Sequence, residues 1–213
     1  MENPKLNSSL RNVLAVASAQ PTKEQPISIE VWAKLLKLQT FNEPSLDRLV
    51  ESAARFALNV RSQHHPHWLS IVGTSGTGKT HTARQLWKML SSGFTSAGLG
   101  YMPHFVCWPE FVDAMRDRVS QGLPLEKYRD MAKWPLLVLD DIGAERDTTG
   151  FASEKLNGLL TQRVGRWTIL TSNLNLEQIA QVEPRIASRI VREAGNLFVE
   201  LDTVDYGLRQ KHQ

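Results

Sequence analysis

Hydrophobic positions in this chain follow one period before residue 68 and a different pattern after it. Between Leu46 and Val60 apolar residues recur every three or four positions, which predicts an amphipathic helix that starts near Pro44. From Trp68 onward, short apolar runs alternate with such helical patterns. Alternation of this kind is typical of a parallel sheet covered by helices on both faces. The pattern therefore predicts an α/β protein.

Five apolar runs are predicted to be strands, and helical patterns follow the first four. The expected strands are 68–72, 104–108, 136–139, 168–170 and 197–199. The expected helices are 28–38, 46–60, 79–90, 111–119, 151–164 and 184–194. In helix 28–38, Val31, Leu35 and Leu38 lie on one apolar face; Val119 marks helix 111–119, and Val164 is expected to face inward in helix 151–164. Ligands of such a sheet bind at the carboxyl ends of its strands, so chemistry is expected there.

Composition narrows the class of protein without identifying it. The 213 residues suffice for one domain, and 41% hydrophobic with 22% charged residues is ordinary globular usage. A single cysteine, Cys107, excludes a disulfide framework and a four-thiolate zinc site. We find no apolar run that could span a bilayer and no signal-peptide core, so we expect a cytoplasmic protein. The net charge of +3 is too small to establish an anionic partner.

A glycine-rich segment follows the first expected strand and matches the pattern G-x-x-x-x-G-K-[ST] in full. Glycines let the backbone curl so that several N–H groups converge on a polyphosphate, and the next helix directs its positive end at it. Lys79 is expected to bind the β and γ phosphates, and the Thr80 hydroxyl to bind Mg²⁺. The expected nucleotide contacts are Gly73, Thr74, Ser75, Gly76, Thr77, Gly78, Lys79, Thr80 and His81.

Polar residues end two of the buried strands. Asp140 and Asp141 close the run 136–139, and Asn173 follows the run 168–170. We expect Asp140 to hold Mg²⁺, directly or through water, and Asp141 to activate the attacking water. Asp141 is one methylene shorter than a glutamate, which predicts slow turnover or a bridging water. Asn173 is expected to contact the γ phosphate or position the water.

The last expected helix, 184–194, carries arginines at helical spacing. Arg185, Arg189 and Arg192 fall opposite its apolar side. One interpretation is a solvated helix face. The other is an arginine finger that completes the site of a neighbouring subunit, because a phosphate loop alone leaves transition-state charge under-compensated. The sequence leaves both interpretations open.

Several of these segments together resemble the AAA+ ATPases of the DnaC/DnaI helicase-loader and IstB family. The run Asp140-Asp141-Ile142-Gly143-Ala144-Glu145 is especially characteristic, as is 169–174. The resemblance covers about residues 41 to 206 and is carried by 68–80, 136–145, 154–160, 169–174 and 184–190.

The resemblance implies a P-loop AAA+ fold of three layers without a C-terminal lid, with ATP and Mg²⁺ as cofactors. It implies that residues 73–80 are the Walker A motif, that Asp140 and Asp141 are the Walker B acids, and that Asn173 is sensor 1. Arg189 would be the arginine finger, with Arg185 a second candidate. Loaders form nucleotide-dependent oligomers, bind single-stranded DNA and deliver a hexameric replicative helicase to it. IstB-type members instead help a transposase to select target DNA.

We expect two parts in the chain, an N-terminal extension at 1–40 and an AAA+ ATPase domain at 41–213. Helix 28–38 either docks a partner or packs on the ATPase core. Basic residues between the second strand and Asp140, together with Tyr128 and Trp134, could contact DNA, but interleaved acids favour a solvated surface. A nucleotide-gated interaction module with negligible hydrolysis is a third reading of the function.

Overall fold

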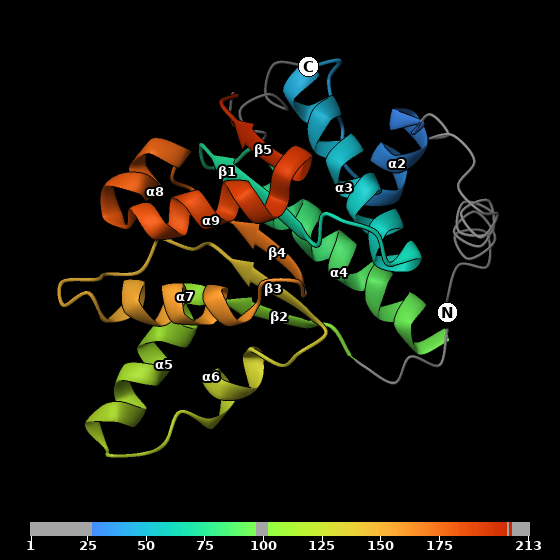
Figure 1. Cartoon of the computed structure of the whole chain (residues 1–213). Coiled ribbons are helices and arrows are strands. Elements are labelled where there is room, and N and C mark those ends of the chain that lie inside the picture. Colours follow the sequence, from blue (N-terminus) through green and yellow to red (C-terminus); the bar gives the residue numbers. More distant parts are fainter. Residues whose placement is uncertain (1–26, 97–101, 204, 206–213) are drawn as a thin grey trace.

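A five-stranded parallel sheet forms the centre of the computed structural model, which describes residues 27–96, 102–203 and 205 (Figure 1). The strands are β1 (Trp68–Gly73), β2 (His104–Cys107), β3 (Leu136–Asp140), β4 (Trp167–Thr171) and β5 (Phe198–Leu201). Their order in the sheet is β2-β3-β4-β1-β5, and every neighbouring pair is parallel. The predicted α/β class is thereby confirmed.

The central strands are buried on both faces, as their continuous apolar runs predict. Every residue of β1, β3 and β4 is buried. The predicted second strand is one residue too long, because Trp108 begins the next helix. The last strand starts at Phe198 and continues to Leu201, so its prediction was short at the carboxyl end.

Two groups of helices cover the two faces of the sheet (Figure 1). On one face lie α2 (Ile29–Leu36), α3 (Pro44–Ser62) and α4 (Lys79–Ser96). On the other lie α5 (Trp108–Ser120), α6 (Glu126–Met131), α7 (Phe151–Gln162), α8 (Leu176–Val182) and α9 (Pro184–Ala194). A 3₁₀ turn, η1 (Gly195–Leu197), leads from α9 into β5.

Alternate residues of each strand supply the two cores. Leu69 and Ile71 of β1 pack with α2, α3 and α4, whereas Trp68 and Val72 pack with the helices of the other face. This period of two fixes the strand register, because a slip of one residue would exchange the two faces. The rigid sheet in turn fixes which side chains meet at its carboxyl edge.

The predicted core faces of three helices need correction. Val31 is 43% exposed, and α2 instead buries Trp32 and Leu36, which lie four residues apart on the same side of the helix. Leu38 is buried from the loop after the helix and Leu35 packs partly buried against the same core, so of the three only Val31 lies away from it. Val164, which was expected to face inward, and Val119, which marks the second of the expected helices after β1, are about half exposed at or beyond the last turns of α7 and α5.

The described part of the expected N-terminal extension packs on the same core as α3 and α4. Residues 1–26, the remainder of that predicted segment, lie outside the described residues. In the part of the chain that the structure describes, no helix combines the length and the apolar character needed to cross a bilayer.

Candidate nucleotide-binding site

The glycine-rich loop joins β1 to α4 at the carboxyl edge of the sheet, as predicted. Gly73 has a φ of 115°, and a Cβ there would lie 2.0 Å from the Leu201 carbonyl oxygen, so a side chain is excluded. At Gly76 a Cβ would lie 1.8 Å from a carboxylate oxygen of Asp205. The loop is therefore held against the end of β5, and α4 starts directly after it at Lys79.

Two threonine side chains in the loop hold its shape. The Thr77 hydroxyl, which is buried, donates to the Thr74 carbonyl oxygen at 3.0 Å. The Thr74 hydroxyl donates to the Thr203 carbonyl oxygen at 3.2 Å and so points toward the segment after β5. Ser75 is exposed at the tip of the loop. These residues can bind a phosphate through their backbone N–H groups, as the sequence predicts.

Lys79 is a buried cation at the first turn of α4, with 4% of its surface exposed. Its Nζ donates to the Thr74 carbonyl oxygen and lies 3.4 Å from the Thr77 hydroxyl. Within the described ranges no carboxylate forms an ion pair with it. Burial lowers the pKa of Lys79 to about 8, against the opposing effect of Asp141 and Asp140, so the side chain is charged at pH 7. A buried ammonium that is charged and has no carboxylate ion-pair partner in the described ranges is suited to bind an anion.

Asp140 accepts hydrogen bonds from two hydroxyl groups of neighbouring elements. The Thr80 hydroxyl donates to Asp140 Oδ1 at 2.9 Å, and the Thr171 hydroxyl donates to the same atom at 2.6 Å. The sheet brings them together, because Asp140 ends β3 and Thr171 ends the adjacent β4. Carboxylate and hydroxyl oxygens are the ligands that Mg²⁺ prefers. These oxygens therefore fit the metal that a phosphate-binding site of this kind requires.

Asn173 bonds to Asp141. Asn173 Nδ2 donates to Asp141 Oδ1 at 2.5 Å, and the Asp141 backbone N–H donates to the Thr171 hydroxyl at 2.9 Å. Asp141 has a φ of 63°, an uncommon conformation for a residue with a side chain. Burial and, next, the Asp140 charge raise the pKa of Asp141, while Lys79 and Asn173 oppose the rise. A carboxyl with a raised pKa is the better proton acceptor.

A cavity of about 310 Å³ opens beside these groups. Its lining residues are Lys37, Leu38, Gly76, Gly78, Lys79, Thr80, His81 and Asn173. The ring nitrogen Nε2 of His81 lies 2.9 Å from the Leu36 carbonyl oxygen and so ties α4 to the end of α2. The sequence analysis missed Lys37 and Leu38. No motif marks them, and it placed both inside a helix, whereas Lys37 has a φ of 53° and ends α2.

The two candidate arginine fingers lie apart from this cavity. Arg189 of α9 is half-buried rather than solvated, and its Nη1 donates to the side-chain oxygen of Asn157 at 2.6 Å and to the Asn157 carbonyl oxygen at 3.3 Å. Arg185 is exposed in the first turn of α9. Neither lines the cavity of its own chain. Any role at a phosphate would therefore require a second copy of the chain.

Fold and site together define a P-loop nucleotide-binding protein with the AAA+ fold. The strand with the phosphate loop, β1, and the strand with the two acids, β3, flank β4 in one parallel sheet. Residues that follow β1 and β4 line the cavity, and the two acids at the end of β3 bond to two of these, Thr80 and Asn173. The chain belongs to the family of IstB-like ATP binding proteins, whose model matches residues 41–192.

The chain is similar to proteins of bacterial replication initiation. It is 25% identical over 140 residues to the replicative helicase loader DnaI of Bacillus subtilis strain 168, covering 65% of this chain and 43% of that protein. The DnaC helicase loader crystal structure matches with a TM-score of 0.58 and 21% identity, over 76% of this chain and 92% of that one. AMPPCP-bound DnaA from Aquifex aeolicus matches with a TM-score of 0.54 and 23% identity, over 72% and 45%. These structural matches confirm the predicted AAA+ fold.

Proposed function

We propose that this chain is a magnesium-dependent ATPase that acts in DNA replication and loads a hexameric replicative helicase onto single-stranded DNA. The observation that carries the ATPase proposal is the buried Lys79, which has no carboxylate ion-pair partner among the described residues and lines a cavity together with Asn173, the bonded partner of Asp141. Similarity to the helicase loaders DnaI and DnaC supports the role in replication. We place this activity in the cytoplasm.

Binding of the triphosphate would rest on the loop and on Lys79. The backbone N–H groups of residues 74–80 converge at the first turn of α4, whose dipole favours an anion. The Lys79 ammonium would exchange its present bonds to Thr74 and Thr77 for the phosphate oxygens. Lys37 and Leu38 would line the far side of the bound nucleotide, because they form that wall of the cavity.

Thr80 and Asp140 would hold the metal through the oxygens that now bond each other. Bound Mg²⁺ would supply neutralisation of charge on the phosphate oxygens. Thr171 holds Asp140 in place by donating to the same carboxylate oxygen.

Asp141 would accept the proton of the attacking water, and Asn173 would hold the carboxylate and position that water. Their direct bond of 2.5 Å ties the Asp141 side chain to Asn173, which lines the cavity, while the Asp141 backbone is held by Thr171. The raised pKa brings the acid nearer to the working pH, which favours general-base catalysis.

Arg189, with Arg185 as the second candidate, would act on the nucleotide of a neighbouring copy in an oligomer. Both lie on α9, outside the cavity of their own chain. A guanidinium supplied in trans makes hydrolysis depend on assembly, so a monomer would turn over slowly.

For the two parts of the chain, we propose residues 41–213 as the ATPase domain. Packing of α2 through Trp32 and Leu36 supports the view that residues 29–38 are attached to that domain rather than free to dock a partner. The exposed side of α2, with Val31, is the part that could still contact a partner.

Phosphate release, measured with and without single-stranded DNA, tests the ATPase proposal. Pull-down of a replicative helicase with the tagged chain, with and without ATP, tests the loader role. The loader proposal expects ATP-dependent capture of the helicase and DNA-stimulated hydrolysis. The family match favours a second candidate, an IstB-type regulator that selects target DNA for a transposase. ATP-dependent capture of a transposase in place of the helicase would support that candidate.

A further inference from the structure

Cations and aromatic rings gather at the amino edge of the sheet, on the side opposite the nucleotide cavity. His67, His104, Lys133, Trp134 and Arg166 lie just before or at the first residues of four strands, and we call them the amino-edge patch. Those four strands are adjacent, in the order β2-β3-β4-β1. At about 4.8 Å per strand, the row extends over about 14 Å.

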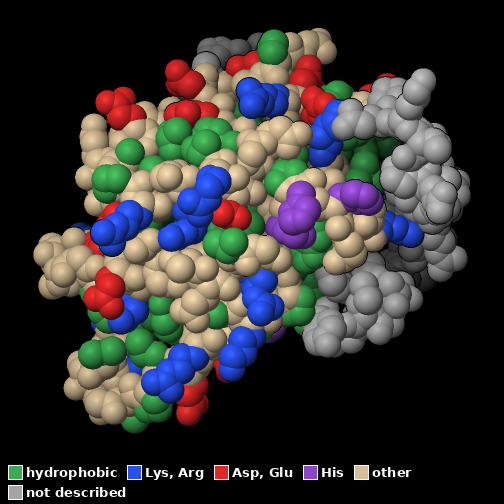
Figure 2. All heavy atoms as spheres, in the orientation of Figure 1, with side chains coloured by type: hydrophobic (Ala, Val, Ile, Leu, Met, Phe, Trp, Pro, Cys, Tyr) green, Lys and Arg blue, Asp and Glu red, His purple; other side chains and the backbone are tan. Residues whose placement is uncertain are grey.

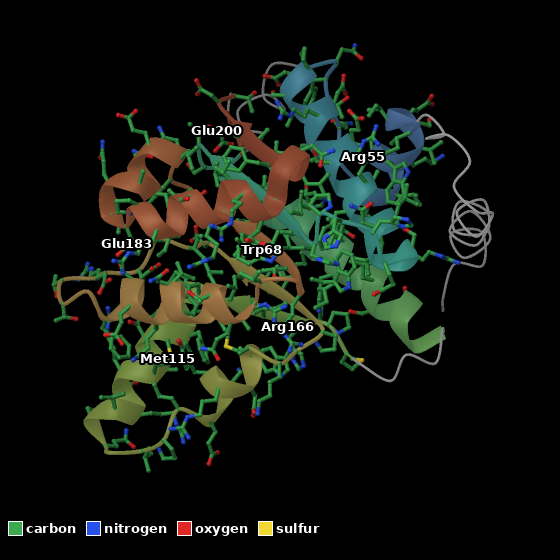
Figure 3. The ribbon with its side chains drawn as sticks, viewed as in Figure 1. Arg55, Trp68, Met115, Arg166, Glu183 and Glu200 are labelled. Atoms are coloured by element: carbon green, nitrogen blue, oxygen red, sulfur yellow. The ribbon has the colours of Figure 1, made fainter. Side chains whose placement is uncertain are left out.

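Two ring contacts give the patch flat surfaces. His104 and Trp134 stack with centroids 3.7 Å apart and an interplanar angle of 15°, and both side chains are half-buried. His67 packs edge-on against Trp167 at 4.3 Å. Arg166, labelled in Figure 3, is exposed between these two contacts, and its Nη1 reaches the Lys133 carbonyl oxygen at 3.4 Å. Rings and cations are thus interleaved along one edge.

The positive charge of the patch is not neutralised nearby. Among the described residues, Lys133 and Arg166 have no carboxylate within 4.0 Å. Asp130, three residues before Lys133, is exposed on α6, and the charge of Glu193 opposes the lowering of the His67 pKa by burial and His65. Figure 2 shows Lys and Arg side chains spread over the lower part of the viewed face, where α6 and the starts of β3 and β4 lie.

A buried arginine adds to the positive charge beneath the patch. Arg163 is fully buried, and its guanidinium donates to the carbonyl oxygens of Met131, Trp134 and Trp167 and to the Thr168 hydroxyl. Its pKa falls to about 9 through burial and the neighbouring Arg166, so it stays charged at pH 7. Burial, and then Lys127 and Arg163, lower the pKa of His104. Lys127 and Arg163 thus act as positive charges on the His104 ring.

We propose that the amino-edge patch binds single-stranded nucleic acid, with phosphates on Lys133 and Arg166 and a base against the His104–Trp134 stack. Unpaired cations beside accessible rings are the features that bind single strands without sequence preference, whereas an acidic polypeptide would use the cations alone. The strands place this surface at the edge remote from Lys79 and Asp140. The nucleic-acid strand and the nucleotide would therefore occupy separate surfaces of the chain. The inference does not rest on ATP hydrolysis.

Fluorescence anisotropy of labelled oligo(dT), titrated without nucleotide at several salt concentrations, tests the proposal. The double variant Lys133→Ala/Arg166→Ala should bind about tenfold more weakly, and its log–log salt slope should fall by about 1.4, or 0.7 for each lost phosphate contact. The control Lys34→Ala/Arg48→Ala removes two exposed cations from α2 and α3 and should bind like the parent chain. Both double variants should keep the parent melting temperature, since all four side chains are exposed.

Two results would overturn the proposal. One is equal loss of oligo(dT) binding in the test and control variants, which would mean that overall charge decides affinity. The other is displacement of oligo(dT) by polyglutamate of the same charge at equal concentration. That result would show that the surface recognises negative charge alone and makes no specific contact with bases. A Lys79→Ala chain should bind oligo(dT) as the parent does, so failure of the ATPase proposal and failure of this one are distinguishable.

Discussion

At the scale of single residues, the candidate site depends on a few buried charged groups held by short hydrogen bonds. Lys79, Asp140 and Asp141 converge because the loop and the ends of β3 and β4 meet at one edge. The sequence predicted this convergence, since parallel strands end together and the motif fixes the order of the loop residues. It could not predict Lys37 and Leu38, whose place in the cavity depends on where α2 ends.

Replacement of Lys79 by alanine should reduce ATP affinity by at least about 100-fold, because it removes the buried cation that would face the phosphates. Calorimetric titration with ATP measures the change. The control Lys34→Ala removes an exposed lysine of α2 and should leave the affinity unchanged. Parent-like affinity in the Lys79→Ala chain would contradict the assigned site.

ATP affinity should be level below pH 8 and weaken above it, because Lys79 has a pKa of about 8 in the free protein. The bound phosphates would hold the proton on Lys79, so binding above pH 8 must include proton uptake, and affinity falls by up to about tenfold per pH unit. Titrations at pH 7, 8 and 9 measure the slope. A Lys79→Arg chain, whose guanidinium stays charged, should show no such slope above pH 8; a flat parent profile would refute the prediction.

Asp141→Asn should keep ATP affinity within about threefold and reduce turnover by roughly 100-fold or more, because the amide cannot accept a proton from water. Phosphate release and nucleotide binding are measured on the same preparation. Asn173 can still bond the new amide oxygen, so the local fold should persist. Unimpaired phosphate release would remove the general-base role from Asp141.

At the scale of elements, the sequence predicted the helices and strands well where their apolar faces were complete. It failed at Val31, Val119 and Val164, because periodicity does not show where a helix leaves the sheet. Asn175 and Gln178 form a capping box at the start of α8, which their spacing of three residues indicates. Arg163 was not recognised, since an arginine near a helix end has the pattern of a surface residue.

Arg163→Met should lower the free energy of unfolding by about 3 kcal/mol or more, because it leaves several buried carbonyl oxygens around the α6–β3 turn and β4 without donors. Chemical denaturation followed by tryptophan fluorescence measures the loss. The neighbouring Arg166→Met is the matched control and should change stability by less than about 0.5 kcal/mol, since Arg166 is exposed. Equal losses of stability in the two variants would contradict the role of the Arg163 hydrogen bonds in stabilising the fold.

At the scale of the whole molecule, the proposed site is incomplete in one chain. Arg189→Ala should abolish hydrolysis yet be rescued in mixtures with the Lys79→Ala chain, because the two lesions affect opposite halves of a shared site. Phosphate release against mixing ratio measures the rescue. Asn157→Ala is the control, because it removes the side-chain partner of Arg189 within the chain and leaves the guanidinium present. Absence of rescue, or an equal defect in Asn157→Ala, would show that Arg189 acts only by joining α9 to α7.

The position of β4 has a genetic consequence. Its last residue, Thr171, donates a hydrogen bond to Asp140. Arg166, which directly precedes the first residue of β4, lies at the opposite end of the strand and only five positions before Thr171 in the sequence. Damaging alleles in this short segment should therefore fall into two phenotypic groups. One group should be deficient in ATP hydrolysis and the other in binding of single-stranded nucleic acid. An allele that disrupts the middle of β4, at Ile169, should show both defects at once.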